Sequence, residues 1–476
     1  MRRIFVALLL LLVTVPALAQ DQSEQITSPQ PVSSVQGTIT ITGTVNPSDL
    51  MNYFFEVTDA NADPNSANWT PVTLPSKNPV TNGALAQLNT AIVPDGLYTL
   101  RLHVVHTTGQ STYVTVGPLR FSNAGVVQPT TEPTAVPATQ APAAATPVPR
   151  PTVTNKLPLP VGGQVNDFDE NAATLMQQTG MTWIKWQIPF TVGDDSLVGV
   201  ARDRINWSHQ HGFLALLSIT GNPAELAQQG DDAYDPLYAA YLGKVAALQP
   251  DAIEIWNEMN IDRQWPTGKI NPVSYVKMLQ QAHDAIKAVD PSIMVITGAL
   301  SPTGAEGAFG LDRVWNDDRY YLGMANAGAA QYADCIGVHY NEGIIAPDAT
   351  SGDPRDNYPT HYFQPMMQRA LTPFASSGLP LCVTELGYLS GDGFSQAIPS
   401  GFAWADNVTV QDQAQWLAQA IQIGASTGKI KMIIIFNVDF TQFVDNDPQG
   451  GYAIIRPDKS CPACQTIGAL QSTTSP

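Results

Sequence analysis

Eight short apolar runs of β-forming residues recur along the C-terminal two thirds of the chain, with helical stretches between them. The stretches at 272–291 and 409–427 have apolar residues at helical spacing and end near Pro or Gly. Strands that alternate with helices predict a parallel sheet, and eight such units predict an α/β fold, a (β/α)8 TIM barrel over 157–472. The runs are 157–165, 181–188, 213–220, 252–259, 293–300, 335–340, 381–386 and 432–438.

Two glutamates occupy the same setting in this pattern. Glu258 ends the fourth run, in IEIWNEMN, and Glu385 ends the seventh, in LCVTELGY. A barrel collects its catalytic residues at the C-terminal ends of the strands, so these two carboxylates are predicted to share one cleft. Hydrolysis of a glycosidic bond needs such a pair, one as proton donor and one as nucleophile. Either glutamate alone is more often a solvated or ion-paired loop residue; together, in barrel order, they favour catalysis.

The residues around both glutamates resemble the active-site signature of glycoside hydrolase clan A, with families 5 and 39 the most similar. The resemblance extends from about Leu157 to Leu470. It implies a retaining hydrolase that needs no cofactor. The motifs that carry it are Trp256-Asn257-Glu258, His339-Tyr340 and Thr384-Glu385.

Carried over position by position, the resemblance implies a role for each motif residue. Glu258 becomes the acid/base, Glu385 the nucleophile and Asn257 the donor to the sugar 2-hydroxyl. Tyr340 would hydrogen-bond Glu385 and hold it ionised. We expect Glu258, next to Trp256 and facing a second carboxylate, to keep its proton longer than Glu385 does.

The chain departs from the clan pattern at two places. The eighth strand commonly presents a Trp at the first sugar subsite, where this chain has Phe436 and Asn437. The second strand often has an Arg near the nucleophile, where this chain has Lys185, a cation without the forked donor geometry.

Side chains near the predicted rim are candidate sugar contacts. Aromatic rings there either stack on sugars or pack in the core, and His339 is as much a core candidate as a ligand. Trp315 and Trp404 lie in longer loops, and either could line a subsite. The predicted substrate-binding residues are Lys185, Trp186, Trp256, Trp265, His339, Tyr388, Phe436 and Asn437.

The first residues are predicted to be a signal peptide, 1–19. Arg2 and Arg3 precede an apolar run, and Ala17-Leu18-Ala19 gives the small-residue pattern of a cleavage site. The mature chain is therefore expected to be secreted, at the cell surface or periplasmic. No Cys follows the cut and no later stretch approaches the roughly 18 apolar residues of a membrane span, so neither a lipid anchor nor membrane insertion is expected.

Two further regions precede the barrel. Residues 26–122 alternate in β-branched runs and predict a small all-β sandwich that resembles bacterial immunoglobulin-like modules in GTITITG and PDGLYTLR. There Trp69 and Tyr98 could bind sugar, although packing is the commoner role. Residues 126–155 are rich in Pro, Thr and Ala, which predicts a semi-rigid linker.

The cysteines suggest a disulfide rather than a metal site. Cys461 and Cys464 form a CPAC motif, which in an exported chain favours a short-loop disulfide over zinc. Cys335 and Cys382 start adjacent predicted strands. They are interpreted as buried free thiols, with a cross-strand bridge as the alternative.

The formal net charge of −18 argues against nucleic acid and anionic membranes as partners. It also disfavours strongly anionic polysaccharides, so the expected substrate is a neutral, β-linked oligo- or polysaccharide, and the protein is expected to be a monomer. The rival hypothesis is a catalytically inert surface protein whose barrel only binds glycan. The paired glutamates favour the enzyme, whereas Lys185 and the missing eighth-strand Trp favour the rival.

Overall fold

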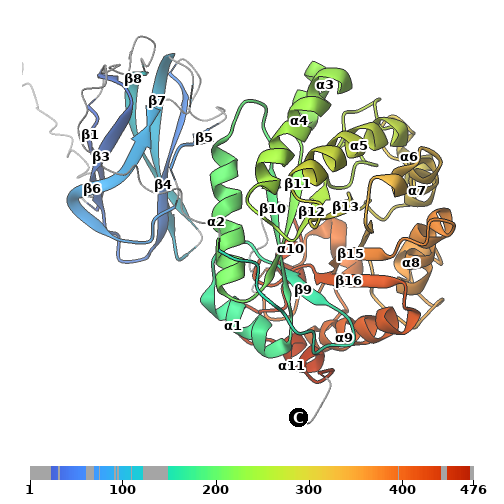
Figure 1. Ribbon diagram of the computed structural model, residues 1–476. Coiled ribbons are helices and arrows are strands. Elements are labelled where there is room, and N and C mark those ends of the chain that lie inside the picture. Colours follow the sequence, from blue (N-terminus) through green and yellow to red (C-terminus); the bar gives the residue numbers. More distant parts are fainter. Residues whose placement is uncertain are drawn as a thin grey trace, which may run out of the picture. The chain divides into compact units, whose positions relative to one another are not determined.

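The computed structural model describes residues 23–30, 33–60, 69–73, 75–90, 93, 96–108, 110–121, 148–394, 396–440 and 447–471. The chain divides into two compact units, Met1–Thr139 and Gln140–Pro476 (Figure 1). The predicted signal peptide and most of the predicted linker lie outside the described residues. Within the described ranges no helix has the length and hydropathy to cross a membrane.

The first unit is a β-sandwich, as the sequence predicts. Its sheets have the strand orders β1-β3-β6 and β2-β8-β7-β4-β5. In β7, Leu100, Leu102 and Val104 are buried and the residues between them are not, so one row of side chains enters the core that both sheets share. The strands are β1 (Glu24–Ser28), β2 (Ser34–Val35), β3 (Thr38–Val45), β4 (Leu50–Asp59), β5 (Thr70–Pro71), β6 (Val80–Asn89), β7 (Gly96–His106) and β8 (Ser111–Phe121).

The second unit is a closed barrel of eight parallel strands, and each of the eight predicted runs overlaps one of them. The strand order is β13-β12-β11-β10-β9-β16-β15-β14. The ring closes where Ile296 of β13 bridges Cys335, directly before β14. The strands are β9 (Val161–Gln164), β10 (Trp183–Pro189), β11 (Leu214–Thr220), β12 (Ala252–Ile255), β13 (Met294–Thr297), β14 (Ile336–Tyr340), β15 (Leu381–Leu386) and β16 (Ile430–Ile435).

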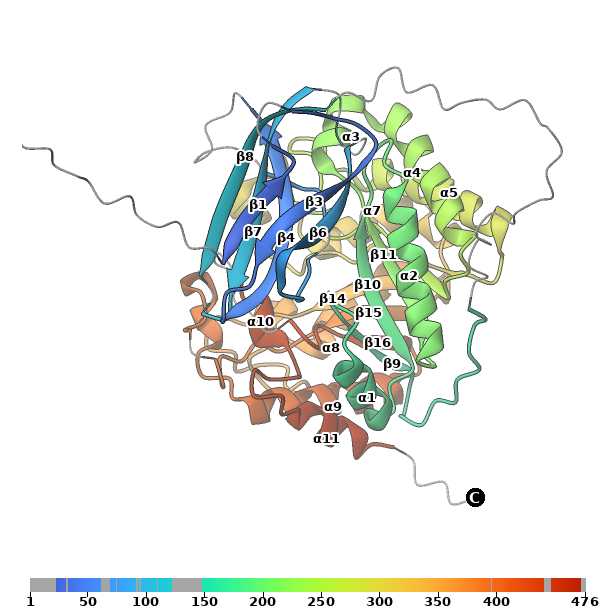
Figure 2. The ribbon, with the colours of Figure 1, turned by 90° about the vertical axis from the view of Figure 1, so that its left-hand side faces the viewer.

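Helices surround the barrel sheet (Figures 1 and 2). The two longest show how local sequence sets their ends: α9 starts at a capping box of Thr409 and Asp412 and stops at Gly428, and α5 starts at the cap Asn271. The helices are α1 (Glu170–Thr179), α2 (Ser196–Gln210), α3 (Pro223–Gln229), α4 (Asp231–Ala246), α5 (Pro272–Val289), α6 (Glu306–Phe309), α7 (Asp317–Asn326), α8 (Phe363–Leu371), α9 (Val410–Thr427), α10 (Gln449–Tyr452) and α11 (Pro462–Gly468).

An apolar layer fills the barrel interior near the N-terminal ends of the strands; we call it the floor. Cys335 and Cys382 lie in it and form a disulfide with their Cα atoms 5.8 Å apart. The interpretation as free thiols is therefore wrong, because neighbouring parallel strands bring the two inward side chains within bonding distance. The floor consists of Trp183, Leu216, Ala252, Ile296, Cys335, Cys382, Met432 and Ile434.

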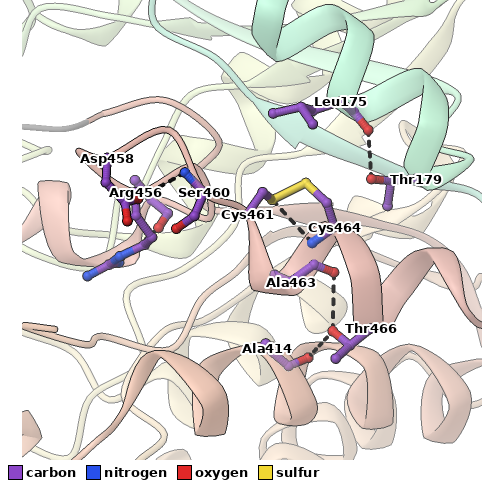
Figure 3. The surroundings of a disulfide bond; sticks show 11 residues. Leu175, Thr179, Ala414, Arg456, Asp458, Ser460, Cys461, Ala463, Cys464 and Thr466 are labelled. Atoms are coloured by element: carbon purple, nitrogen blue, oxygen red, sulfur yellow. Dashed lines mark hydrogen bonds between the residues drawn. A yellow bond between two sulfur atoms is a disulfide. The ribbon is translucent and has the colours of Figure 1, made fainter. Parts of the chain in front are cut away.

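The predicted CPAC disulfide is confirmed. Cys461 and Cys464 are bonded at the start of α11 (Figure 3). One turn later, the Thr466 hydroxyl donates to the carbonyl of Ala414 in α9 and so joins the two helices. No free cysteine is present in the part of the chain that the structure describes.

Residues 148–155, the end of the predicted linker, belong structurally to the second unit; we call them the strap. Arg150 Nε lies 2.6 Å from Asp251 Oδ1, and Arg150 Nη1 donates to Ser292 Oγ at 3.1 Å. The Val148 carbonyl is 2.9 Å from His209 Nδ1. Asp251 and Ser292 precede β12 and β13, so the strap lies at the floor end of the barrel. Within the predicted linker, residues 148–155 therefore pack on the barrel, because Arg150 and Val148 both bond to it.

Candidate active site

Glu258 and Glu385 lie at the C-terminal ends of β12 and β15. After β12 the chain takes positive φ angles at Trp256 (72°) and Glu258 (48°), a tight turn that leaves the Glu258 amide to donate to Ala299 O at 2.8 Å. In β15 the pairing with β14 skips Thr384, so Thr384 and Glu385 both contact interior residues. Glu258 is 8% and Glu385 6% exposed.

Lys185 connects two carboxylates inside the barrel. Along β10, Trp183 and Lys185 face the interior and Trp186 packs toward the helices. Lys185 Nζ lies 3.2 Å from Glu385 Oε1 and 3.2 Å from Glu254 Oε2. Burial alone would lower the pKa of Lys185, but the charges of Glu254 and Glu385 outweigh it and raise the pKa. Glu385 therefore has a permanent cation beside it.

Glu254 is a site residue that the sequence reasoning missed. It lies in β12, two residues after the floor residue Ala252, and is fully buried. Thr384 Oγ1 donates to Glu254 Oε1 at 2.6 Å. Burial would raise the pKa of Glu254, but the charges of Lys185 and His339 and the bond from Thr384 lower it. The sequence feature that could have revealed Glu254 is a single acidic residue within the otherwise apolar strand AIEI.

His339 brings the two candidate catalytic carboxylates together. Its Nδ1 lies 3.3 Å from Glu258 Oε1 and 3.6 Å from Glu385 Oε2, and the side chain is fully buried. These two oxygens can be no farther apart than the two distances laid end to end. Burial would lower the pKa of His339, but the charge of Glu385 and the bond to Glu258 raise it.

The protonation of Glu258 differs from the expectation. Burial raises its pKa, but the hydrogen bond and charge of His339 and the nearby Arg263 lower it below the ordinary value. Arg263 Nη2 lies 3.4 Å from Glu258 Oε2. In this state Glu258 is ionised rather than proton-bearing, because two cationic donors face its two oxygens.

Tyr340 does not hydrogen-bond Glu385, so that prediction is wrong. Successive side chains of a strand face opposite sides, and His339 takes the interior position in β14. Tyr340 packs against Phe363 of α8 and its hydroxyl donates to the His361 carbonyl at 3.0 Å. Lys185 and His339 make the contacts to Glu385 that Tyr340 was expected to make.

Four predicted sugar platforms are core residues, so those predictions are wrong. Trp186 is 1% exposed and donates to Ser208 of α2. Trp256 and Trp265 are buried against each other, with ring centroids 4.9 Å apart. Tyr388 is fully buried beside Tyr340. Each ring occupies the outward side of a strand or the base of a loop, and the sequence does not reveal this.

Of the remaining candidates, two have opposite properties. Asn257 is 6% exposed, and its Oδ1 has no hydrogen-bond partner among the described residues. Asn437 is fully buried, and both ends of its amide are hydrogen-bonded within the chain. Its Nδ2 donates to Gln449 O, and its Oδ1 accepts from the Phe440 amide. The prediction of Asn437 as a substrate contact is therefore wrong, whereas Asn257 has an acceptor to offer.

Three of the aromatic residues that the sequence analysis named keep some exposed surface. Phe436 follows β16 and packs on Phe440 and Tyr452, with 8% of its surface exposed. Trp404 and Trp315 are both partly exposed. Arg355 stacks over Trp404 at 4.7 Å and Arg319 over Trp315 at 4.8 Å, so each indole already has one face covered.

No protein-family model and no curated protein matches the chain. Solved structures that match in part include a family 39 glycoside hydrolase from the gut symbiont Bacteroides cellulosilyticus WH2, with 15% identity, a TM-score of 0.49 and coverage of 94% of this chain and 83% of that one.

Two further matches have lower scores. An exo-β-1,4-mannosidase from Opitutaceae bacterium strain TAV5 has 12% identity, a TM-score of 0.43 and coverage of 66% and 59% of the two chains. A Bacteroides uniformis β-glucuronidase has 12% identity, a TM-score of 0.41 and coverage of 95% and 50%. With identities and scores this low, we base the function on the geometry of the chain's own cleft.

Proposed function

We propose that the protein is a retaining glycoside hydrolase with Glu385 as nucleophile and Glu258 as acid/base. The supporting observation is that one buried histidine, His339, contacts both carboxylates at the C-terminal end of a parallel barrel. Two glutamates at this separation suit attack by one and proton transfer by the other. An inert glycan-binding barrel would have no use for a buried Lys185 directed at one of them.

The proposed reaction is a double displacement. Glu385 forms a bond to the anomeric carbon while the bond from that carbon to the leaving oxygen breaks and Glu258 gives its proton to that oxygen. Water then attacks the same carbon, Glu258 takes the water proton, and the bond to Glu385 breaks. Lys185 Nζ lies 3.2 Å from Glu385 Oε1 and holds this carboxylate in position, and Asn257 Oδ1, which has no partner among the described residues, is placed for a sugar hydroxyl.

The proposed substrate is a neutral, β-linked oligo- or polysaccharide outside the cytoplasm. The net charge of −18 disfavours polyanions, and the predicted signal peptide supports export. Hydrolysis of a panel of aryl β-glycosides tests the class of activity. If the purified full-length protein hydrolyses none of them and none of several neutral polysaccharides, the inert glycan-binding hypothesis replaces this one.

Azide rescue tests the two roles. In Glu385→Ala, azide should restore turnover of an activated aryl glycoside and give a glycosyl azide of inverted configuration, because azide attacks the substrate directly. In Glu258→Ala, azide should attack the glycosyl-enzyme and give the retained product. Product configuration is read by NMR. The same configuration from both variants would contradict the assignment.

A further inference from the structure

Among the described residues, Arg263 is the only exposed cation in contact with the candidate acid/base. It lies in the loop after β12, its side chain is 73% exposed, and its Nη2 is 3.4 Å from Glu258 Oε2. Among the described residues, Glu258 is its one ion-pair partner. Two other exposed arginines, Arg313 of a loop and Arg319 of α7, are paired with Asp262 and Glu306 instead.

The two oxygens of Glu258 have different neighbours. Oε1 faces His339, which is fully buried, whereas Oε2 faces the exposed Arg263. A leaving group that enters from solvent therefore reaches Glu258 at Oε2. Arg263 occupies that approach in the empty enzyme.

This contact conflicts with the chemistry of the first half-reaction. A guanidinium beside Glu258 Oε2 favours the ionised carboxylate over the protonated acid, and it occupies the position from which a glycosidic oxygen would approach that atom. Consistent with the contact, the pKa of Glu258 is lowered although burial raises it, and Arg263 contributes to the lowering together with His339. Departure of the exposed Arg263 would therefore favour the protonated form of Glu258 that the first half-reaction needs.

We propose, on the basis of the glycosidase function above, that Arg263 is a positioning residue: it holds Glu258 Oε2 in the empty enzyme and is displaced by the leaving group of the bound substrate. Glu258 then takes a proton from solvent and can donate it. An exposed ion pair is weak enough for substrate binding to break. His339 is enclosed and stays with Glu258.

The other charged groups near Glu258 do not change in this step. His339 from β14 and Glu385 from β15 are buried. Lys185 of β10 is fixed between Glu385 and Glu254, a buried residue of β12 itself. Glu342, in the loop after β14, accepts from Thr360 at 2.9 Å, and burial raises its pKa to about 7. Only Arg263 is exposed enough to leave without disturbing the barrel.

The test compares two pH profiles of Arg263→Gln with those of the wild type. The profile of kcat/KM reports groups of the free enzyme, and that of kcat reports groups of the substrate complex. Without Arg263, the basic limb of kcat/KM should move up by about 0.3 to 0.7 pH unit, as expected for one exposed ion pair. The basic limb of kcat should stay in place, because Arg263 has already left in the complex.

Two further variants serve as controls. Arg313→Gln removes a neighbouring exposed arginine that is paired with Asp262, and should move neither limb. Arg263→Lys keeps the cation and should leave the kcat/KM limb near the wild-type position. The proposal is overturned if both limbs of Arg263→Gln move together or if neither moves. A wild-type protein without glycosidase activity would instead overturn the proposed function.

Discussion

The floor and the cleft of the barrel are built by the same strands, two residues apart. Trp183 of the floor precedes Lys185 of the cleft, and Ala252 precedes Glu254. The floor is apolar and closed by a disulfide, whereas the cleft holds buried charges. In the cleft several buried polar atoms, including Gln164 Oε1, have no partner in the described chain.

This difference shows that two residues two positions apart on one strand can serve different purposes, one packing the core and the other forming the active site. Inward side chains recur every second residue, so a strand such as β10 or β12 contributes one residue to the floor and another to the cleft. Packing in the floor needs no ligand to be complete. Unpaired polar atoms in the cleft cost free energy until a substrate satisfies them, a cost typical of functional sites.

The largest effect is expected from Lys185→Met in the cleft. It leaves Glu254 and Glu385 buried together without their cation, which should cost about 3 to 5 kcal/mol of the free energy of unfolding. The kcat should fall at least about 100-fold, because Glu385 loses the cation that contacts and positions it. Denaturant unfolding and kinetics measure both. Lys185→Arg keeps the charge and should lose less stability and less activity than Lys185→Met. If the Met variant matched the wild type in both measurements, a separate role for the cleft would be contradicted.

The floor should give the opposite result. The double variant Cys335→Ala/Cys382→Ala should lose about 2 to 4 kcal/mol of the free energy of unfolding, in proportion to the loop that the disulfide closes. Its kcat on an aryl glycoside should stay within about two-fold of the wild type well below the unfolding temperature. The double variant Cys461→Ala/Cys464→Ala is the matched control, with a shorter loop and a smaller expected loss. A large fall in kcat would show that the two layers are coupled.

The smallest expected effect is a pH-dependent loss of stability in a cleft variant, compared with a pH-independent loss in the floor variant. Glu254 has a pKa below its ordinary value of 4.5, so its contribution to stability is present above that pH and is lost as the pH falls through the folded-state pKa. Glu254→Gln should therefore be less stable than the wild type by about 1 to 3 kcal/mol at pH 7, with a smaller difference near pH 3. The disulfide variant should show a difference that does not depend on pH. Unfolding in urea at several pH values measures both.

The fold was predictable because its signals are local. Each apolar run overlaps a strand, and the helical spacing at 272–291 and 409–427 marks α5 and α9. The two glutamates could be placed at one end of the barrel by counting runs. Counting needs only the order of the strands, which the chain itself provides.

The orientation of side chains was less predictable. Lys185 and Trp186 are adjacent, yet one faces the cleft and the other the helices, and Tyr340 fails as a partner of Glu385 for the same reason. Loop residues were harder still: Arg263 reaches Glu258 only because of the tight turn after β12. A one-residue change of register reverses every such assignment, and sequence periodicity alone does not fix it.

The strap has a consequence for how the enzyme can be attached to a surface. Arg150 fastens the start of the second unit to Asp251 and Ser292, at the end of the barrel opposite Glu258 and Glu385. A bead, pore wall or fused protein joined upstream of Val148 would thus pull on the floor end and leave the mouth of the cleft facing the solution. Immobilised in this way, the enzyme would keep its cleft accessible to long polymers.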